Sequence, residues 1–330
     1  MTLPETFKIV YPAKEKGGIA RIEEVPLVLP GVNQVLVKIE FAPLNPSDLI
    51  TMGDHGYFFD RNPYPCGHEG SGTVVAVGQN LKNPFKVGDR VHVAELGTYG
   101  QYVLAETEYI SPILGDLSFE EAASHYINPA TVYMFGQKLD EGKHKAAIHT
   151  VGASAIGRMM IRYFKEKGVK LINIVRREEL VEEVKKEGAD YVLNSSAPDF
   201  DKTLKELAEK ENATISFDAI GNEFTNRVLS AQPNGSICYV YGVLEGLELQ
   251  KISIMELFKG KSVSALLIFP YVDELKKKGV LTQYFNDVHK HLPTAFKSNI
   301  LKVFPVSELK EALEYFNAHP SQGKVLLKPN

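Results

Sequence analysis

Glycines, a serine and two arginines lie between residues 145 and 177 at a spacing that suits an anionic ligand. Gly152, Ser154 and Gly157 occupy the three marked positions of the pattern G-x-G-x-x-G, with serine in place of the middle glycine. Such a turn lets a diphosphate approach the backbone, and the helix that follows offers free N–H groups to an anion. We therefore expect Gly152 and Ser154 to contact the diphosphate of a dinucleotide.

The residues after the second expected strand indicate which dinucleotide binds. A fold that selects NAD usually carries Asp or Glu about 20 residues past the glycines, where the carboxylate binds the ribose 2′-hydroxyl. Arg176 and Arg177 stand there instead, and planar guanidinium groups pair well with a 2′-phosphate. The sequence thus predicts NADPH, while the two glutamates that follow leave NADH open. In the alternative interpretation, the arginines are the solvated start of a helix at 178–187.

The elements that must position these residues follow from the apolar patterning. Strands are expected at 145–149 and 171–175, with a helix between them whose apolar residues from Ile156 to Phe164 recur at helical spacing. The later elements expected are helices at 178–187, 201–211, 224–231 and 306–318, and strands at 191–193, 214–219, 236–241 and 324–327. This alternation indicates an α/β fold with a doubly wound parallel sheet.

The first part of the chain has a different pattern. Residues 1–125 are β-rich and punctuated by glycine, with strands expected at 35–41, 72–78 and 89–94 that suit an antiparallel, barrel-like domain. We divide the chain into this domain, a nucleotide-binding domain at 126–265 and a C-terminal return at 266–330. Two domains of this kind imply a cleft for ligands between them.

Composition restricts the class of protein. The chain has 330 residues, a net charge of −4 and 44% hydrophobic residues, which is ordinary for a globular protein. This charge gives no reason to expect nucleic acid or a membrane as a partner, and no apolar run approaches the roughly 20 residues of a membrane span. The N-terminal residues show neither a signal nor a transit character. Two cysteines, Cys66 and Cys238, cannot form a disulfide framework, so a cytoplasmic location is expected.

Seven short motifs together resemble the medium-chain dehydrogenase/reductase family over nearly the whole chain. They are LNPSDL at 44–49, GHEGSGTVVAVG at 67–78, VGDRV at 87–91, NPATVY at 128–133, VGASAIG at 151–157, FDAIGN at 217–222 and GKVLL at 323–327. The chain looks most similar to the zinc-free quinone oxidoreductases and the 2-enoyl thioester reductases. The resemblance implies a GroES-like partial barrel, a Rossmann domain, a small-molecule substrate and a homodimer.

The residues themselves argue against a metal centre. Zinc-dependent members of the family use Cys, His and Cys, and here Asn45 and Asn128 stand where the two cysteines would be. His68 with the neighbouring Glu69 supplies too few ligands for tetrahedral zinc. Cys66, two residues before His68, is more simply a structural thiol. No metal is therefore expected.

The resemblance implies direct transfer of hydride from the nicotinamide to an electron-poor C=C or to a quinone. Negative charge on the substrate oxygen then needs a hydrogen-bond donor and a proton source. The family uses a tyrosine in the loop after the NPSD segment, which matches Tyr57 here, with Tyr64 as the fallback. In the alternative, Tyr57 only forms part of an aromatic lid with Phe58 and Phe59. His55 could join a proton relay or simply lie on a surface loop.

Further positions are carried over from the resemblance. Asn45, Asn128 and Thr131 correspond to the nicotinamide end of the cofactor, although Asn128 before Pro129 could instead be a helix N-cap. Leu266, Leu267 and Ile268 fit plain core equally well, and Lys324 could be a solvated lysine. The remaining candidates are Ala153, Ala155 and Ile156 for the diphosphate, Tyr241, Gly242, Val243 and Leu244 at a strand end, Leu266, Leu267 and Ile268 along the nicotinamide, and Lys324 near the 2′-phosphate or the cofactor edge.

Replacing Tyr57 with Phe separates the two enzymatic interpretations. An enoyl reductase that takes its proton from this phenol should lose most of its turnover, about 100-fold or more, because general acid catalysis contributes that much. A quinone reductase that passes electrons without this proton should lose little. Steady-state rates with an enoyl thioester and with a quinone measure both, and unchanged rates with both would leave Tyr57 no role as proton donor.

Overall fold

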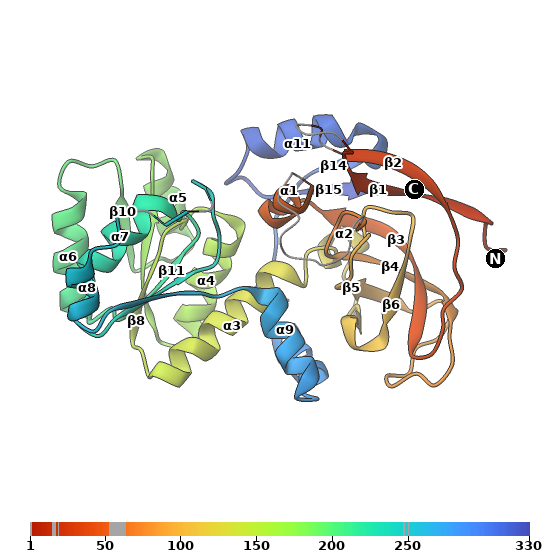
Figure 1. Cartoon of the computed structure of the whole chain (residues 1–330), viewed down its shortest axis with the longest axis horizontal. Coiled ribbons are helices and arrows are strands. Elements are labelled where there is room, and N and C mark those ends of the chain that lie inside the picture. Colours follow the sequence, from red (N-terminus) through yellow and green to blue (C-terminus); the bar gives the residue numbers. More distant parts are fainter. Residues whose placement is uncertain (1, 15–17, 19, 53–63, 247, 250) are drawn as a thin grey trace. The chain divides into compact units, whose positions relative to one another are not determined.

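The computed structural model describes residues 2–14, 18, 20–52, 64–246, 248, 249 and 251–330. The chain forms two compact units (Figure 1). The first unit comprises residues 1–127, 280–289 and 298–330, and the second comprises 128–279 and 290–297. The chain thus passes from one unit to the other four times. The return to the first unit begins later than the expected residue 266, because the segment up to 279 stays with the parallel sheet.

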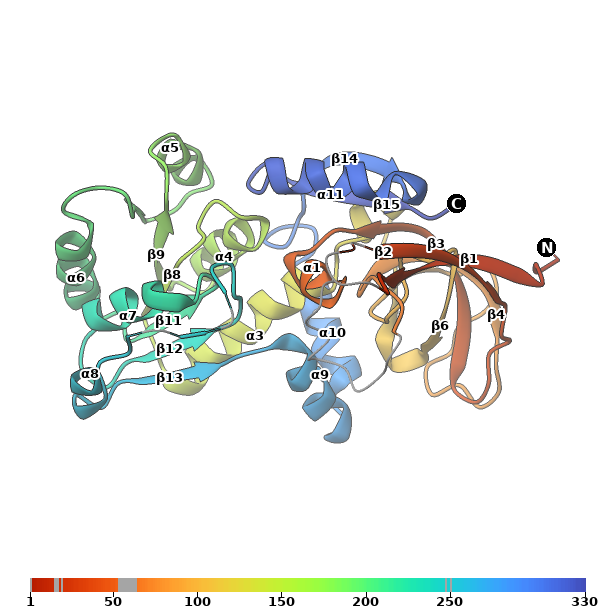
Figure 2. The same ribbon diagram turned by 45° about the horizontal axis from the view of Figure 1, so that its top comes forward.

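The second unit is built on a parallel sheet, which confirms the expected fold class. Across the sheet the described strands are β10 (Tyr191–Asn194), β9 (Lys170–Val175), β8 (Ala146–His149), β11 (Ile215–Asp218), β12 (Ile237–Val240) and β13 (Ser262–Ala265). The accompanying helices are α3 (Ile127–Gly142), α4 (Ala155–Glu166), α5 (Glu179–Lys186), α6 (Phe200–Glu211), α7 (Asn222–Ala231), α8 (Ile254–Phe258) and α9 (Ile268–Lys277). Figure 2 shows α6 and α7 on one side of the sheet and α3 and α4 on the other.

Alternation along the strands explains why helices cover both faces of this sheet. Ile148 of β8 packs in a core cluster with Phe200 of α6 and Phe224 of α7. Phe217 of β11 faces the other way and stacks on Phe135 of α3, with ring centroids 4.2 Å apart. Strands buried on both faces read as apolar runs, and for this reason the sequence pattern located them well.

The first unit is mainly antiparallel, as its sequence indicated. Two strands, β1 (Thr6–Pro12) and β2 (Ala20–Pro26), form a hairpin. The main sheet follows the order β14 (Ile300–Pro305), β15 (Lys324–Lys328), β3 (Gln34–Pro43), β4 (Gly70–Val77), β5 (Arg90–Val93) and β7 (Ile110–Pro112), and β6 (Tyr102–Glu106) also pairs with β3. The helices are α1 (Pro46–Met52), α2 (Phe119–Ala122), α10 (Leu281–His289) and α11 (Leu309–Ala318), with short 3₁₀ turns at Thr107–Tyr109 and Val306–Glu308.

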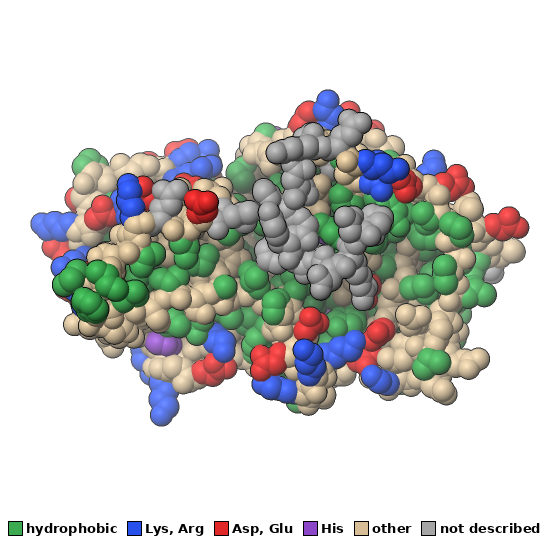
Figure 3. Space-filling view, viewed as in Figure 1, with side chains coloured by type: hydrophobic (Ala, Val, Ile, Leu, Met, Phe, Trp, Pro, Cys, Tyr) green, Lys and Arg blue, Asp and Glu red, His purple; other side chains and the backbone are tan. Residues whose placement is uncertain are grey.

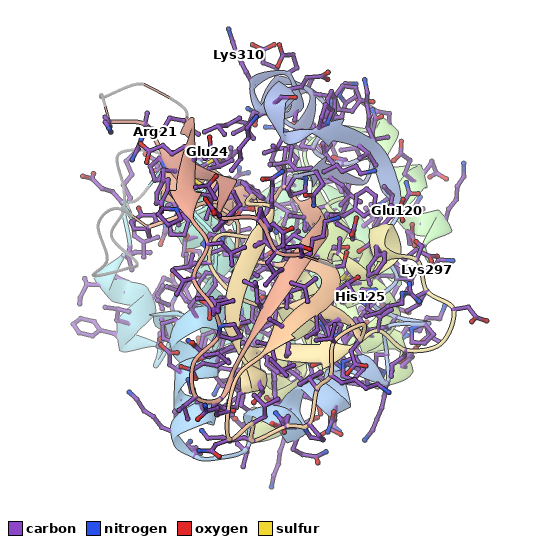
Figure 4. All side chains as sticks on the ribbon, turned by 90° about the vertical axis from the view of Figure 1, so that its right-hand side faces the viewer. Arg21, Glu24, Glu120, His125, Lys297 and Lys310 are labelled. Atoms are coloured by element: carbon purple, nitrogen blue, oxygen red, sulfur yellow. The ribbon has the colours of Figure 1, made fainter. Side chains whose placement is uncertain are left out.

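Three buried histidines meet inside the first unit. His92 of β5 lies with its ring centroid 4.3 Å from that of His289 at the end of α10 and 5.8 Å from that of His125. All three side chains are buried, and Figure 4 labels His125 among the side chains around it. Burial lowers the pKa of His125 from 6.5 to about 4 and that of His289 to about 3. Burial also lowers the pKa of His92. The charge of Glu121 opposes the lowering of the His125 pKa but does not cancel it.

One stretch of the second unit exposes an unusual amount of apolar surface. Figure 3 shows a hydrophobic patch at the place of α8. The exposed large apolar side chains of residues 244–258 are Leu244, Leu249, Ile254, Met255, Leu257 and Phe258. The patch adjoins β13, the last strand of the parallel sheet in the described part of the chain. Among the described residues, no helix combines the length and the apolar character that crossing a bilayer demands.

The histidine cluster predicts a loss of stability in mild acid. The folded chain keeps these imidazoles neutral, whereas an unfolded chain takes up their protons below about pH 6.5. Unfolding therefore binds protons, and the free energy of unfolding should fall between about pH 6.5 and 4 by up to about 1.4 kcal/mol per pH unit for each histidine. Urea unfolding at several pH values measures this slope. The variant His289→Phe should have a shallower slope, and an identical slope in both proteins would contradict the assignment.

Candidate cofactor and active-site residues

The turn between β8 and α4 is built as the glycine pattern predicted. Ser154 is the N-cap of α4, and its hydroxyl accepts the N–H of Gly157 at 3.1 Å. The serine that replaces the middle glycine therefore caps the helix. The glycine pattern alone did not predict this role. The helix start directly follows the carboxyl end of β8, where the N-terminal partial charge of a helix favours an anion.

Glycine is required at both ends of this turn. A Cβ on Gly157 would lie 2.5 Å from the carbonyl oxygen of Gly152 and 2.6 Å from that of Val151. A Cβ on Gly152 would lie 2.8 Å from Cβ of Asn173 on the neighbouring strand. Strand and helix therefore meet closely enough for a ligand diphosphate to approach bare backbone, which is an observation in favour of a dinucleotide.

The two arginines follow directly on β9, and their side chains are exposed. Nε of Arg177 forms an ion pair with Oε1 of Glu179 at 3.3 Å. The main-chain oxygen of Arg176 accepts the hydroxyl of Ser196, at 2.8 Å, so the loop after β10 lies beside it. Two exposed guanidinium groups fit the phosphate of NADPH. The hydroxyl of Ser196 links the loops after β9 and β10, and sequence reasoning missed this contact because the segment of Ser196 carries no motif.

At the carboxyl ends of β11 and β12, hydrogen bonds to one buried carboxylate order the loops that follow. The sequence analysis named the segment after β12 but not this carboxylate. The buried Asp218 accepts the hydroxyl of Thr150 at 2.9 Å, that of Thr225 at 2.6 Å and the main-chain N–H of Ile220 at 2.9 Å. This carboxylate orders the loop beside the turn Tyr241–Leu244. Asp218 belongs to the motif FDAIGN, which the sequence analysis used only as a sign of the family and not as a site residue.

Tyr241 is tied to a buried histidine on β8. Its hydroxyl lies 2.7 Å from Nε2 of His149, and its ring packs edge-on against Phe135 of α3. Burial lowers the pKa of His149 to about 3 and raises that of Tyr241. Both groups are thus neutral at ordinary pH. The segment from Tyr241 to Leu244 follows β12, as expected, and the N–H of Leu244 donates to the main-chain oxygen of Ala219 at 3.0 Å.

The segment Leu266–Ile268 follows β13 at the same edge of the sheet. Leu266 and Ile268 are buried, and Leu267 is the N-cap residue of α9. The burial agrees with the core interpretation of this segment, and the position at a strand end agrees with the cofactor interpretation. On α3, Thr131 is buried and Asn128 is partly exposed. The helix begins at Ile127, so Asn128 is its second residue and not its N-cap.

The first unit gathers a buried cluster of charged and amide side chains. Nδ2 of Asn45 donates to Oε1 of Glu69 at 2.8 Å, and Oδ1 of Asn45 accepts the ammonium of Lys324. All three side chains are almost completely buried. Lys324 is thus part of the interior of the first unit and not the solvated lysine of the alternative interpretation. The amide of Asn45 is engaged on both sides within the protein.

Beside this cluster, Nδ1 of His68 lies 2.5 Å from Oδ1 of Asp48. The position of the first zinc-ligating cysteine thus holds the amide of Asn45, and the ammonium of Lys324 lies next to it. Neither group suits a divalent cation. Within the described residues, no group of three or more His, Cys, Asp and Glu side chains is placed to hold a metal ion. The residues present do not fit zinc.

The proposed proton donor Tyr57, like His55, lies outside the described residues. The fallback Tyr64 is buried, and its hydroxyl donates to the main-chain oxygen of Thr51 at 3.0 Å. Burial raises the pKa of Tyr64. The proton of this phenol is therefore already donated to a main-chain acceptor.

Two family models match the chain. Residues 31–115 match the alcohol dehydrogenase GroES-like domain, and residues 155–278 match the zinc-binding dehydrogenase family. Among curated proteins, the mitochondrial enoyl-[acyl-carrier-protein] reductase of Caenorhabditis elegans is 31% identical over 226 residues, which are 64% of this chain and 62% of that protein. The chain thus spans less than two thirds of that relative's length.

Two further proteins match over nearly the full length. Quinone oxidoreductase 1 of Escherichia coli is 25% identical over 328 residues, 91% of this chain and 97% of that protein. A crystal structure of a provisionally assigned NADPH:quinone reductase from Mesorhizobium loti superposes with a TM-score of 0.86, at 26% identity, and covers 100% of both chains.

Proposed function

The chain belongs to the medium-chain dehydrogenase/reductase family, and on that premise we propose that it is a zinc-independent, NADPH-dependent oxidoreductase. Its substrate is an electron-poor C=C, as in an enoyl thioester or an enone, or a quinone. The observation that carries the proposal is the bare glycine turn before α4 together with the exposed guanidinium groups of Arg176 and Arg177. The curated relatives, enoyl reductases and quinone oxidoreductases, support the substrate class.

The residues of the second unit each supply a different contact to NADPH. The turn Gly152–Ile156 offers backbone N–H groups to the diphosphate, and Arg176 and Arg177 pair with the 2′-phosphate. The turn Tyr241–Leu244 lies at the carboxyl end of the sheet, where doubly wound folds bind ligands. Asn128 and Thr131 of α3 serve the nicotinamide end. When bound, NADPH supplies the two electrons of the reduction as hydride.

The chain's own residues must then manage charge on the substrate oxygen. The phenol of Tyr57 would donate a hydrogen bond to that oxygen and supply the proton, because a tyrosine remains protonated at neutral pH. Since Asn45 and Asn128 replace the two cysteine ligands, this donor takes the part that a Lewis acid plays in zinc-dependent relatives.

The second candidate is a quinone reductase that does not need this proton, and the full-length match to quinone oxidoreductase 1 favours it. A protein that binds NADPH without useful chemistry is the remaining alternative. Steady consumption of NADPH with any of the three substrate classes would exclude it.

The proposal is tested by a turnover screen of crotonyl thioester, a simple enone and a quinone, each with NADPH and with NADH. The wild-type protein should oxidise NADPH with at least one of them. The double variant Arg176→Ala/Arg177→Ala should raise the KM for NADPH about tenfold or more, because charge-assisted hydrogen bonds to the phosphate are lost. Its KM for NADH should change little.

The matched control is Lys185→Ala/Lys186→Ala, which also removes two exposed positive charges from the second unit. This control should leave both KM values close to those of the wild type. Equal losses for NADPH and NADH in the arginine variant would contradict the phosphate assignment, and no turnover with any acceptor would contradict the proposed function.

We also propose that the protein is a homodimer, as the family resemblance implies, and that its interface is formed by β13 and by the exposed apolar side chains of Leu244, Leu249 and α8. The apolar side chains of this patch are otherwise exposed to water. An open strand edge pairs readily with a second strand, and a two-fold axis would place β13 against its own copy. β13, with the sequence Ser-Val-Ser-Ala, carries no charge that would repel that copy.

Light scattering should therefore give twice the mass of one chain, 36.7 kDa. Phe258→Asp places a charge in the patch at a side chain that is 76% exposed, so the variant should fold but sediment as a monomer. Leu29→Asp, at an exposed leucine of the first unit, is the control and should remain dimeric. A monomeric wild type, or a dimeric Phe258 variant, would contradict this interface.

A further inference from the structure

The carboxylate of Glu69 joins three distant parts of the first unit. One oxygen, Oε1, accepts Nδ2 of Asn45 at 2.8 Å. The other, Oε2, accepts the main-chain N–H groups of Tyr126 and Ile127, both at 2.9 Å. The side chain is 1% exposed. A carboxylate in so little water requires donors on both oxygens, and it has them.

Each group around Glu69 has only one possible orientation. Oδ1 of Asn45 must face the ammonium of Lys324, which can only donate, so Nδ2 must face Glu69. Main-chain N–H groups can only donate as well. Burial raises the pKa of Glu69, and the charge of Lys324 and these donors oppose that rise. Every partner of the carboxylate thus favours its ionised form.

The two N–H groups bound by Glu69 stand where α3 starts. Ile127 is the first residue of α3, and the first N–H groups of a helix have no partner within it. Glu69 satisfies two donors at this end, and its charge is favoured by the helix dipole. The same turn carries Asn128, and Thr131 follows one turn later.

We propose that Glu69 is a positioning residue, whose carboxylate, held by Asn45 and Lys324, fixes the first turn of α3 and so orients Asn128 and Thr131 toward the nicotinamide end of NADPH. The inference rests on the proposed function for the role of these two residues. The hold of Glu69 on α3 is independent of that function and can be measured without any substrate.

The variant Glu69→Gln tests how the hydrogen bonds of Glu69 fix the start of α3, and it does not change the size of the side chain. A glutamine can accept the two N–H groups, but its amide N–H₂ then faces Nδ2 of Asn45, donor against donor. Asn45 cannot turn round, because its N–H₂ would then face the ammonium of Lys324. We expect faster hydrogen exchange at residues 126–131 and a KM for NADPH raised about tenfold, from the loss of a buried pairing.

The double variant Glu69→Gln/Asn45→Asp should restore both readouts in large part. An aspartate at position 45 accepts from Lys324 on one side and from the amide of Gln at position 69 on the other. The net charge of the cluster is unchanged, and Gln retains an oxygen for Tyr126 and Ile127. Restoration to within about threefold of the wild-type KM is expected, since each donor again meets an acceptor.

The chain contains a matched control. Glu108 accepts Nδ2 of Asn33 at 2.6 Å and the ammonium of Lys82, so it is also a carboxylate with an amide and an ammonium partner, although Lys82 is mostly exposed and neither donor belongs to α3. The variant Glu108→Gln should lower the melting temperature but leave exchange at 126–131 and the KM for NADPH unchanged. A purely structural role for Glu69 would make the two variants alike.

The proposal is overturned if Glu69→Gln retains wild-type exchange at 126–131, or if its KM for NADPH matches that of Glu108→Gln. It is also overturned if the double variant is no better than Glu69→Gln. Should Glu69→Gln fail to fold, the same readouts on the double variant decide, since near-wild-type values support the pairing and values tenfold worse contradict it. Wild-type protein without turnover would defeat the proposed function, while the exchange data would still judge the hold on α3.

Discussion

The carboxyl edge of the parallel sheet in the second unit depends on one close approach, between the end of β8 and the start of α4. Gly157 sits so near the carbonyl oxygens of Val151 and Gly152 that even a methyl group would collide with them. This closeness brings the free N–H groups of the helix to the carboxyl end of the sheet. The loops after β9, β11 and β12 begin at the same edge, which is where doubly wound folds bind their ligands.

The first unit solves a different problem, which is how to bury charge. Asp48, Glu69 and Lys324 lie in its interior, together with the amide of Asn45 and the imidazole of His68. Buried charges destabilise a fold unless each is paired and hydrogen-bonded. An asparagine between an ammonium and a carboxylate meets this condition on both sides, and the cluster needs no cation from outside. This electrostatic balance explains how the family's scaffold can exist with residues that do not suit zinc.

The sequence predicted nine elements of the second unit, the strands β8 to β12 and the helices α4 to α7, to within about two residues, because buried parallel strands and glycine turns leave local patterns. It gave no bounds for α3, α8, β13 or α9. It could not predict the contacts of Glu69. Its partners Asn45 and Lys324 are 24 residues before it and 255 after it, and no periodicity links such positions. The interior place of Lys324 was missed for the same reason. The nine histidines looked scattered in the sequence, yet three of them meet through strand and helix packing.

The fourfold passage of the chain between its two units has a consequence for how such proteins can be divided or recombined. Neither unit corresponds to one uninterrupted stretch of gene, because the first needs three separate stretches and the second needs two. A single truncation therefore always removes part of one unit or leaves a remnant of the other. Recombination that fuses sequences at a terminus cannot exchange either unit as a whole. The two units must therefore be transferred together.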